Sequence, residues 1–171
     1  MIEIRARVLV HRDHNGATIR GRLVLPFDRR TKTRQRVTIE DGEEMAVMLP
    51  RGLVLRGGDL VATNDGRLIE VVASEEAVLH ITCATPRDLA RAAYHLGNRH
   101  VPVEVGEGFL RIAADHVLRE MLVGLGATVS EMNTAFEPEA GAYAGGHHQH
   151  DDDEHGHSHG AKIHHYGHSH D

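Results

Sequence analysis

Apolar and polar side chains alternate through the first part of the chain, and this alternation predicts β-strands. Residues 2–10 and 18–26 both follow the two-residue period of a half-buried strand, and the second run ends at Pro26. Asp41-Gly42 and Asn64-Asp65-Gly66 separate further strand-like runs and are typical of hairpin turns. Because no helical period occurs in this region, we predict an all-β domain over residues 1–73.

The pattern changes after Ala73 and predicts two helices among short strands. Residues 77–85, 101–105, 108–114 and 127–132 are strand-like, whereas residues 86–97 and 115–126 have the helical period. The resulting order, βαββαβ, is that of a ferredoxin-like sheet with two helices on one face. We therefore predict an α+β chain whose second domain covers residues 74–140.

Helix ends and faces can be predicted from single residues. Pro86 suits a first helical turn, and Asp115 suits an N-cap. Gly97 and Gly126 stand where a left-handed residue ends a helix. The apolar positions expected to face the core are Leu89, Ala92, Ala93 and Leu96 in the first helix, and Val117, Leu118, Met121, Leu122 and Leu125 in the second.

Residues 141–171 lose all periodicity, and we expect a flexible, disordered tail there. Ten of the sixteen histidines lie in its last 25 residues: His147, His148, His150, His155, His157, His159, His164, His165, His168 and His170. Imidazole is a ligand that suits nickel, copper and zinc. The alternative is a tail that only adds solubility, but the density and the His-x-His spacing favour metal binding.

Charge and missing motifs narrow the function. The net charge is −6, and residues 147–171 carry five acidic residues and one lysine, so the remainder is close to neutral. This balance argues against nucleic acid as the main partner. The basic run at 29–36 is either a solvated turn or a surface that docks on an acidic partner. Phosphate-binding, nucleophile-elbow and metalloprotease motifs are absent, so we expect no enzyme.

The N-terminal residues are too charged for a secretory signal, and no apolar run reaches the ~18 residues that span a bilayer. Cys83 is the only cysteine and cannot form an internal disulfide. These features predict a cytoplasmic protein. Cys83 itself is expected to be a buried, small apolar residue.

His100 is the histidine of the folded part most suited to metal, although a plain surface histidine is the alternative. It follows the first helix and its Gly97 stop, on an exposed connection. One imidazole cannot hold a metal alone, but a two-fold dimer would bring two copies together. Asp115 and His116 could form a weaker peripheral site, or be an N-cap and a surface residue. His80 and His95 are expected to be structural.

Four stretches together resemble the UreE family of urease accessory proteins, which are nickel metallochaperones. They are "RRTKTRQRVTIEDGEEMAVMLPRGLVLRGGDLV", "YHLGNRHVPVEV", "DHVLREML" and "FEPEAGAY", the last of which is followed by the His-rich tail. The resemblance spans nearly the whole chain in the same order. It implies a partner-binding β domain and a metal-binding domain that forms a homodimer. It also implies that His100, one from each chain, is the interfacial metal ligand.

The resemblance further implies delivery of Ni²⁺ to apo-urease, in an assembly that includes the GTPase UreG and the other accessory proteins. Cu²⁺ and Zn²⁺ would share the same ligands, and Cu²⁺ is expected to bind more tightly. Some family members have a His-x-His near the second helix; here Ala114 replaces the first histidine, so a site on His116 and Asp115 is expected to be weak. The competing hypotheses are a metal-storage protein that acts through the tail, and a protein–protein adaptor.

Overall fold

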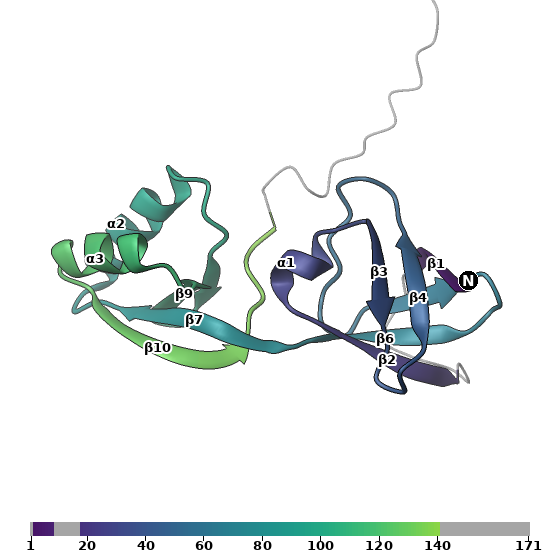
Figure 1. Cartoon of the computed structure of the whole chain (residues 1–171). Coiled ribbons are helices and arrows are strands. Elements are labelled where there is room, and N and C mark those ends of the chain that lie inside the picture. The colour runs from purple at the N-terminus through teal and green to yellow at the C-terminus, as the bar shows by residue number, and fades with distance from the viewer. Residues whose placement is uncertain (1, 9–17, 141–171) are drawn as a thin grey trace, which may run out of the picture. The chain divides into compact units, whose positions relative to one another are not determined.

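The computed structural model describes residues 2–8 and 18–140, which contain ten strands and three helices (Figure 1). The first group of elements is β1 (Ile2–Val8), β2 (Ile19–Leu25), α1 (Phe27–Arg30), β3 (Arg34–Thr38), β4 (Glu44–Met48), β5 (Leu60–Thr63) and β6 (Leu68–Ala73). The second group is β7 (Glu75–Thr82), α2 (Pro86–Gly97), β8 (Glu104–Gly106), β9 (Phe109–Ala113), α3 (His116–Gly124) and β10 (Thr128–Ala135). The His-rich tail predicted over 141–171 lies outside the described residues.

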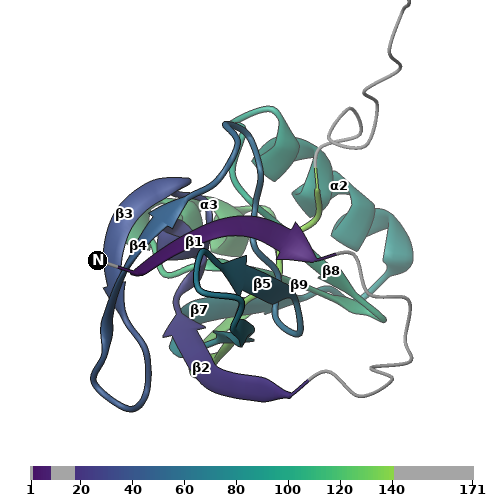
Figure 2. The same ribbon diagram turned by 90° about the vertical axis from the view of Figure 1, so that its right-hand side faces the viewer.

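The first group forms one six-stranded sheet in the order β2-β6-β5-β1-β4-β3. Both predicted turns are present as hairpin connections, between β3 and β4 and between β5 and β6. The sheet curls until its two edge strands, β2 and β3, approach each other, and the N–H of Glu40, just after β3, donates to the carbonyl of Arg22 on β2 at 3.0 Å. Figure 2 shows this curl from the side. The concave face holds the first core, which includes Ile4, Leu23, Val37, Met45, Val47, Leu55, Ile69 and Val71.

Two pairings in this sheet were not predicted. β1 pairs with β4, and β2 with β6, in the parallel sense. A parallel pair needs a long connection rather than a tight turn, so no local turn signal marks it in the sequence. The domain also contains one helical turn, α1, where the sequence analysis found only strands. Pro26 precedes α1 and has an extended backbone, with a φ of −70° and a ψ of 163°.

The second group forms a four-stranded sheet in the order β10-β7-β9-β8, with α2 and α3 against one face (Figure 1). With six elements in the order βαββαβ, this confirms the predicted ferredoxin-like domain. Its core lies between the sheet and the helices, and consists of Leu79, Ile81, Ala92, Leu96, Leu110, Ile112, Leu122 and Ala127. The predicted boundary at residue 73 falls between β6 and β7.

Both long helices begin at side-chain caps. The Thr85 hydroxyl accepts from the N–H of Asp88 at 3.1 Å, with Pro86 in the first turn of α2. The Asp115 carboxylate accepts from the N–H of Leu118 at 2.8 Å, which confirms the predicted N-cap of α3. Gly126 has a φ of 88°, as expected for the residue that ends α3.

Two details of the helix prediction were wrong. Val117, in the first turn of α3, is 59% exposed, because it lies on the solvent side of the helix rather than on the core face. Gly97 is the last residue of α2 and does not have a positive φ; the chain makes one further turn, and His100 has the left-handed conformation instead.

A fully buried arginine, Arg30, fastens the segment after β10 to the first sheet. Its guanidinium donates to the carbonyls of Leu25 and Leu55 at 3.2 and 3.3 Å. Its Nη1 also lies 2.7 Å from Oε1 of Glu137, and its Nη2 donates to the carbonyl of Phe136. With three carbonyls and a carboxylate as acceptors, the buried charge is well compensated.

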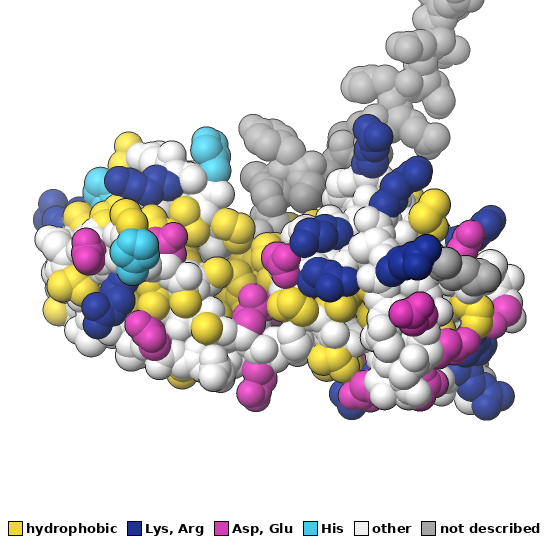
Figure 3. Space-filling view, in the orientation of Figure 1, with side chains coloured by type: hydrophobic (Ala, Val, Ile, Leu, Met, Phe, Trp, Pro, Cys, Tyr) yellow, Lys and Arg dark blue, Asp and Glu magenta, His cyan; other side chains and the backbone are white. Residues whose placement is uncertain are grey.

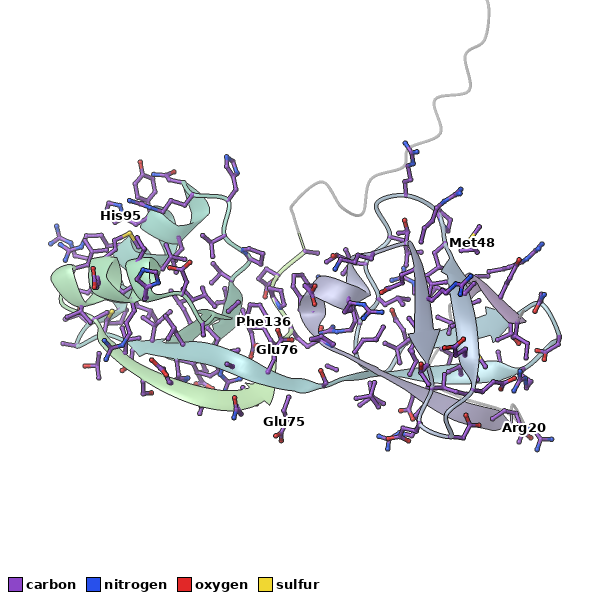
Figure 4. The ribbon with its side chains drawn as sticks, viewed as in Figure 1. Arg20, Met48, Glu75, Glu76, His95 and Phe136 are labelled. Carbon is purple, nitrogen blue, oxygen red and sulfur yellow. The ribbon has the colours of Figure 1, made fainter. Side chains whose placement is uncertain are left out.

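Further contacts surround this ion pair. The N–H of Gly57 donates to Oε1 of Glu137 at 2.8 Å, and a Cβ on Gly57 would lie 2.9 Å from that oxygen. Phe136, which is labelled in Figure 4, packs edge to face on Phe27 with ring centroids 5.6 Å apart. Arg56 adds a second, longer ion pair to Glu137 at 3.4 Å. Residues 136–137 are therefore anchored by both charge and packing.

None of the helices formed by the described residues is long and apolar enough to cross a membrane.

Candidate functional site

His100 lies in the exposed connection between α2 and β8. The connection is held by backbone bonds to the last turn of α2: the N–H of Arg99 donates to the carbonyl of Leu96 at 3.0 Å, and the N–H of His100 to that of Gly97 at 2.9 Å. Val101 returns to the Leu96 carbonyl at 3.3 Å. These bonds fix the backbone of His100 while its side chain stays open to solvent.

The backbone of His100 is in the left-handed region, with a φ of 56°. Every other described residue with a positive φ is a glycine. A side chain at such a position costs free energy, which glycine would avoid. Conformations of this kind cluster at functional sites, where a particular side chain is needed at a turn. Histidine is one of the non-glycine residues that adopt this region more often than most.

The described residues around His100 offer few further ligands. His95 is one turn earlier on α2 and packs edge to face on Tyr94, with centroids 5.5 Å apart (Figure 4). Arg99 turns its Nη1 to the His95 carbonyl at 3.2 Å. Within residues 2–8 and 18–140, no three histidine, cysteine, aspartate or glutamate side chains are grouped as a metal site would need. A metal bound at His100 would therefore need ligands from the tail, from a second copy of the chain, or from both.

The second predicted pair, Asp115 and His116, is adjacent at the start of α3. One carboxylate oxygen of Asp115 is taken up by the cap to Leu118, and His116 is exposed. The pair is thus an N-cap followed by a surface histidine, with a single carboxylate oxygen still free to bind a cation. Ala114, whose N–H donates to the Ala77 carbonyl at 3.1 Å, supplies no ligand.

His80 and Cys83, on and just after β7, are both half-buried. His80 is half-buried, with its ring 4.8 Å from that of Phe109. Cys83 packs against the core, and burial raises the pKa of its thiol; the Asp88 carboxylate raises it further, against the opposing effect of Arg91. A thiol that stays protonated is a poor metal ligand; Cys83 packs against the core as expected, but it is partly rather than fully buried.

The ten tail histidines, His147 to His170, lie outside the described residues, as do His11 and His14. The structure does describe the segment from which the tail departs. The N–H of Glu139 donates to the carbonyl of Val103 at 2.8 Å, and the N–H of Glu137 to the carboxylate of Glu104 at 3.0 Å. Residues 137–139 are therefore bonded to the segment that follows His100. The sequence alone does not show this proximity, because only the fold joins residues 33 and 36 positions apart.

Comparison with known proteins identifies the family. Residues 4–74 match the model of the N-terminal domain of the UreE urease accessory protein, and residues 76–171 match the model of its C-terminal domain. A urease accessory protein UreE from Nitrosospira multiformis is 55% identical over 143 residues, which cover 83% of this chain and 81% of that protein.

Two further relatives carry the same name. The protein from Ralstonia nicotianae is 56% identical over 76% of this chain and 62% of its own length. That from Burkholderia vietnamiensis is 54% identical over 75% of this chain and 65% of its own length. The two domain models together cover almost the whole chain in order, and the chain belongs to the UreE family of urease accessory proteins.

Proposed function

We propose that this protein is a nickel metallochaperone of urease maturation, which binds Ni²⁺ through His100 and passes it on for assembly of the urease active site. The observation that carries the proposal is an exposed imidazole on a turn whose backbone would favour glycine. Because the chain belongs to a family of urease accessory proteins, a role in urease maturation is favoured over a catalytic role. Imidazole nitrogen is among the ligands that suit nickel.

Two copies of the chain complete this site in the proposal. A two-fold contact brings the same residue of each copy to the axis, so that His100 supplies two imidazoles. The helical layer that carries His100 exposes apolar side chains suited to such a contact: Tyr94, Val117 and Val123 are each more than half exposed. In Figure 3, yellow apolar side chains lie among the histidines of this layer.

Two imidazoles leave coordination positions free for incoming and outgoing ligands. The tail histidines, His147 to His170, fill them during loading, and ligands of the receiving protein replace them during transfer. The ion then changes ligands one at a time and is never released bare. The receiving partners are apo-urease and the other accessory proteins, including the GTPase UreG, and the exchange takes place in the cytoplasm. Cu²⁺ and Zn²⁺ compete for the same ligands.

Equilibrium dialysis with Ni²⁺ tests the proposal on the full chain and on a chain cut after Gly146, each with and without His100→Ala. About one ion per two chains should remain bound to the shortened protein, and the substitution should abolish that binding. The oligomeric state, measured by light scattering, should be a dimer in all four forms. A shortened chain that binds no nickel would contradict the His100 site.

The second candidate function is nickel storage through the tail alone, favoured by ten histidines within 25 residues. Under that hypothesis, the cut after Gly146 removes all binding and His100→Ala has no effect. An adaptor without a metal role is distinguished by urease activation in cells, since an adaptor should tolerate His100→Ala whereas a metallochaperone should not.

A further inference from the structure

We propose that the solvent face of β3 and β4 is a docking surface for an acidic segment of a partner protein in urease maturation, with Met48 as its apolar centre. We define the Met48 patch as Arg34, Arg36, Met48 and Arg51. The proposal rests on the proposed function for the identity of the partner assembly, but the surface itself follows from the described side chains. Most of the patch lies in or beside the basic run at 29–36, for which the His100 site provides no role.

Strand register places Arg34, Arg36 and Met48 together on one face, and Arg51 follows the end of β4 by three residues. Arg34 is the cross-strand partner of Met48, and Arg36 is that of Ala46. The parallel pair of β1 with β4 matches Glu3 to Ala46 on this face, and Glu3 is ion-paired with Arg5 at 2.6 Å. Met48 is 41% exposed, beside Arg34 on the neighbouring strand.

The positive charges of the patch are not neutralised within the described part of the chain. Arg34, Arg36 and Arg51 are exposed and form no ion pair with any described residue, whereas the nearby Lys32 pairs with Asp28 at 2.9 Å. In Figure 3, dark blue side chains gather at the upper right of the molecule, over β3 and β4, and most of the acidic side chains on that side lie lower. A charged surface of one sign favours a partner of the opposite sign.

Side chains rather than strand pairing make the contact. β3 is an edge strand, to which an extended peptide could add. However, the guanidinium of Arg29 already donates to the outward carbonyl of Arg36 at 2.9 Å and is itself held by Gln35. This blocked edge is a usual protection against edge-to-edge pairing. The ligand therefore lies across the face, with carboxylates on the arginines and an apolar side chain on Met48.

An acidic protein segment fits the patch better than nucleic acid does. The chain as a whole has a net charge of −6. Single-stranded nucleic acid is bound by aromatic side chains interleaved with basic ones, and the patch has a methionine at its centre and no aromatic residue. An exposed methionine suits adaptable apolar contact with a protein.

Charge reversal on the full-length chain tests the patch, with binding to the apo-urease assembly purified from cells that lack this protein. Arg34→Glu should weaken binding about fivefold or more at low salt, through one lost attraction and one new repulsion. Arg20→Glu is the matched control: Arg20 is exposed, has no ion pair among the described residues, and lies on β2, away from Met48 in Figure 4. It should change the Kd less than twofold.

Two more measurements separate the components of the contact. Met48→Ser should weaken binding several-fold at any salt concentration, because it removes apolar contact rather than charge. The effect of Arg34→Glu should shrink at high salt, where exposed charges are screened. Nickel binding should be unchanged in all three variants, so a loss of partner binding with intact nickel binding is specific to the patch.

Three results would overturn the inference. The first is equal weakening by Arg34→Glu and Arg20→Glu, which would reflect net charge alone. The second is no binding of the wild-type chain to the assembly. The third is tighter, patch-dependent binding of a fluorescent single-stranded oligonucleotide, which would make the surface a nucleic-acid site. If instead nickel binding fails in the wild-type chain while patch-dependent docking persists, the proposed function fails and the docking surface stands.

Discussion

His100 combines an exposed imidazole with a backbone conformation that glycine would adopt without cost. We expect His100→Gly to raise the free energy of unfolding by about 1 kcal/mol relative to His100→Ala, because only alanine keeps a Cβ at a φ of 56°. Both substitutions should abolish nickel binding by the folded part. Chemical denaturation and equilibrium dialysis on the two variants measure the two effects.

This pair of variants separates folding from metal binding at one position. A stable His100→Gly protein without nickel would show that the histidine is retained for its ligand nitrogen at the expense of stability. Equal free energies of unfolding for the two variants would show that the turn relaxes in solution to another conformation. Nickel retained by both variants would contradict the role of His100.

Asp115 is another residue with two possible roles, as the cap of α3 and as a ligand beside His116. Asp115→Ala should lower the free energy of unfolding by about 1 kcal/mol, because the N–H of Leu118 loses its acceptor. Asp115→Asn removes the carboxylate but still caps a helix well, so it should cost much less. Nickel affinity should stay the same in both. A nickel affinity reduced by Asp115→Asn would instead indicate a peripheral site.

At the scale of the elements, local signals were sufficient for most of the fold. Hairpin turns, helix periods and the Asp115 cap act within a few residues, and so the ferredoxin-like order could be predicted. The parallel pairs β1–β4 and β2–β6 join segments far apart in the chain, and no local signal marks them. The exposure of Val117 depends on where α3 meets the sheet, which the periodicity alone does not determine.

The candidate site was predictable in part for the same reason. His100 was predicted on an exposed connection after the first helix, and it lies there. Its left-handed backbone was assigned to Gly97, because glycine is the usual residue at such an end; one extra turn moved the position to the histidine. Its metal role and the pairing of two copies came from the family resemblance and stay predictions.

At the scale of the whole molecule, the Arg30–Glu137 ion pair connects the first sheet with the segment that leads to the tail. Arg30 is fully buried, while Glu137 is 35% exposed. Glu137→Gln should lower the free energy of unfolding by up to about 3 kcal/mol, since it leaves a buried guanidinium without its carboxylate. The three carbonyl acceptors of Arg30 remain and moderate the loss.

The matched control for this substitution is Glu131→Gln on β10, which is exposed and forms no ion pair with any described residue. It should change the free energy of unfolding by less than about 0.5 kcal/mol. Denaturant unfolding of both variants gives the comparison. Equal stabilities would mean that the ion pair contributes nothing beyond the packing of Phe27 on Phe136, and that packing alone anchors the segment.

Proton competition acts on the whole nickel-loading apparatus, folded part and tail together. An imidazole binds metal only when it is neutral, and a histidine free of other interactions has a pKa of about 6.5. Nickel capacity of the full chain should therefore fall steeply as the pH is lowered from 7.5 to 6, with the ten tail histidines losing their ions together. The chain cut after Gly146 should bind fewer ions at every pH.

The tail also changes from net negative to net positive as its histidines gain protons, which repels the cation further and steepens the loss. Titration calorimetry at a series of pH values measures both curves, and a full-length capacity that is flat over this range would show that carboxylates rather than imidazoles hold the nickel.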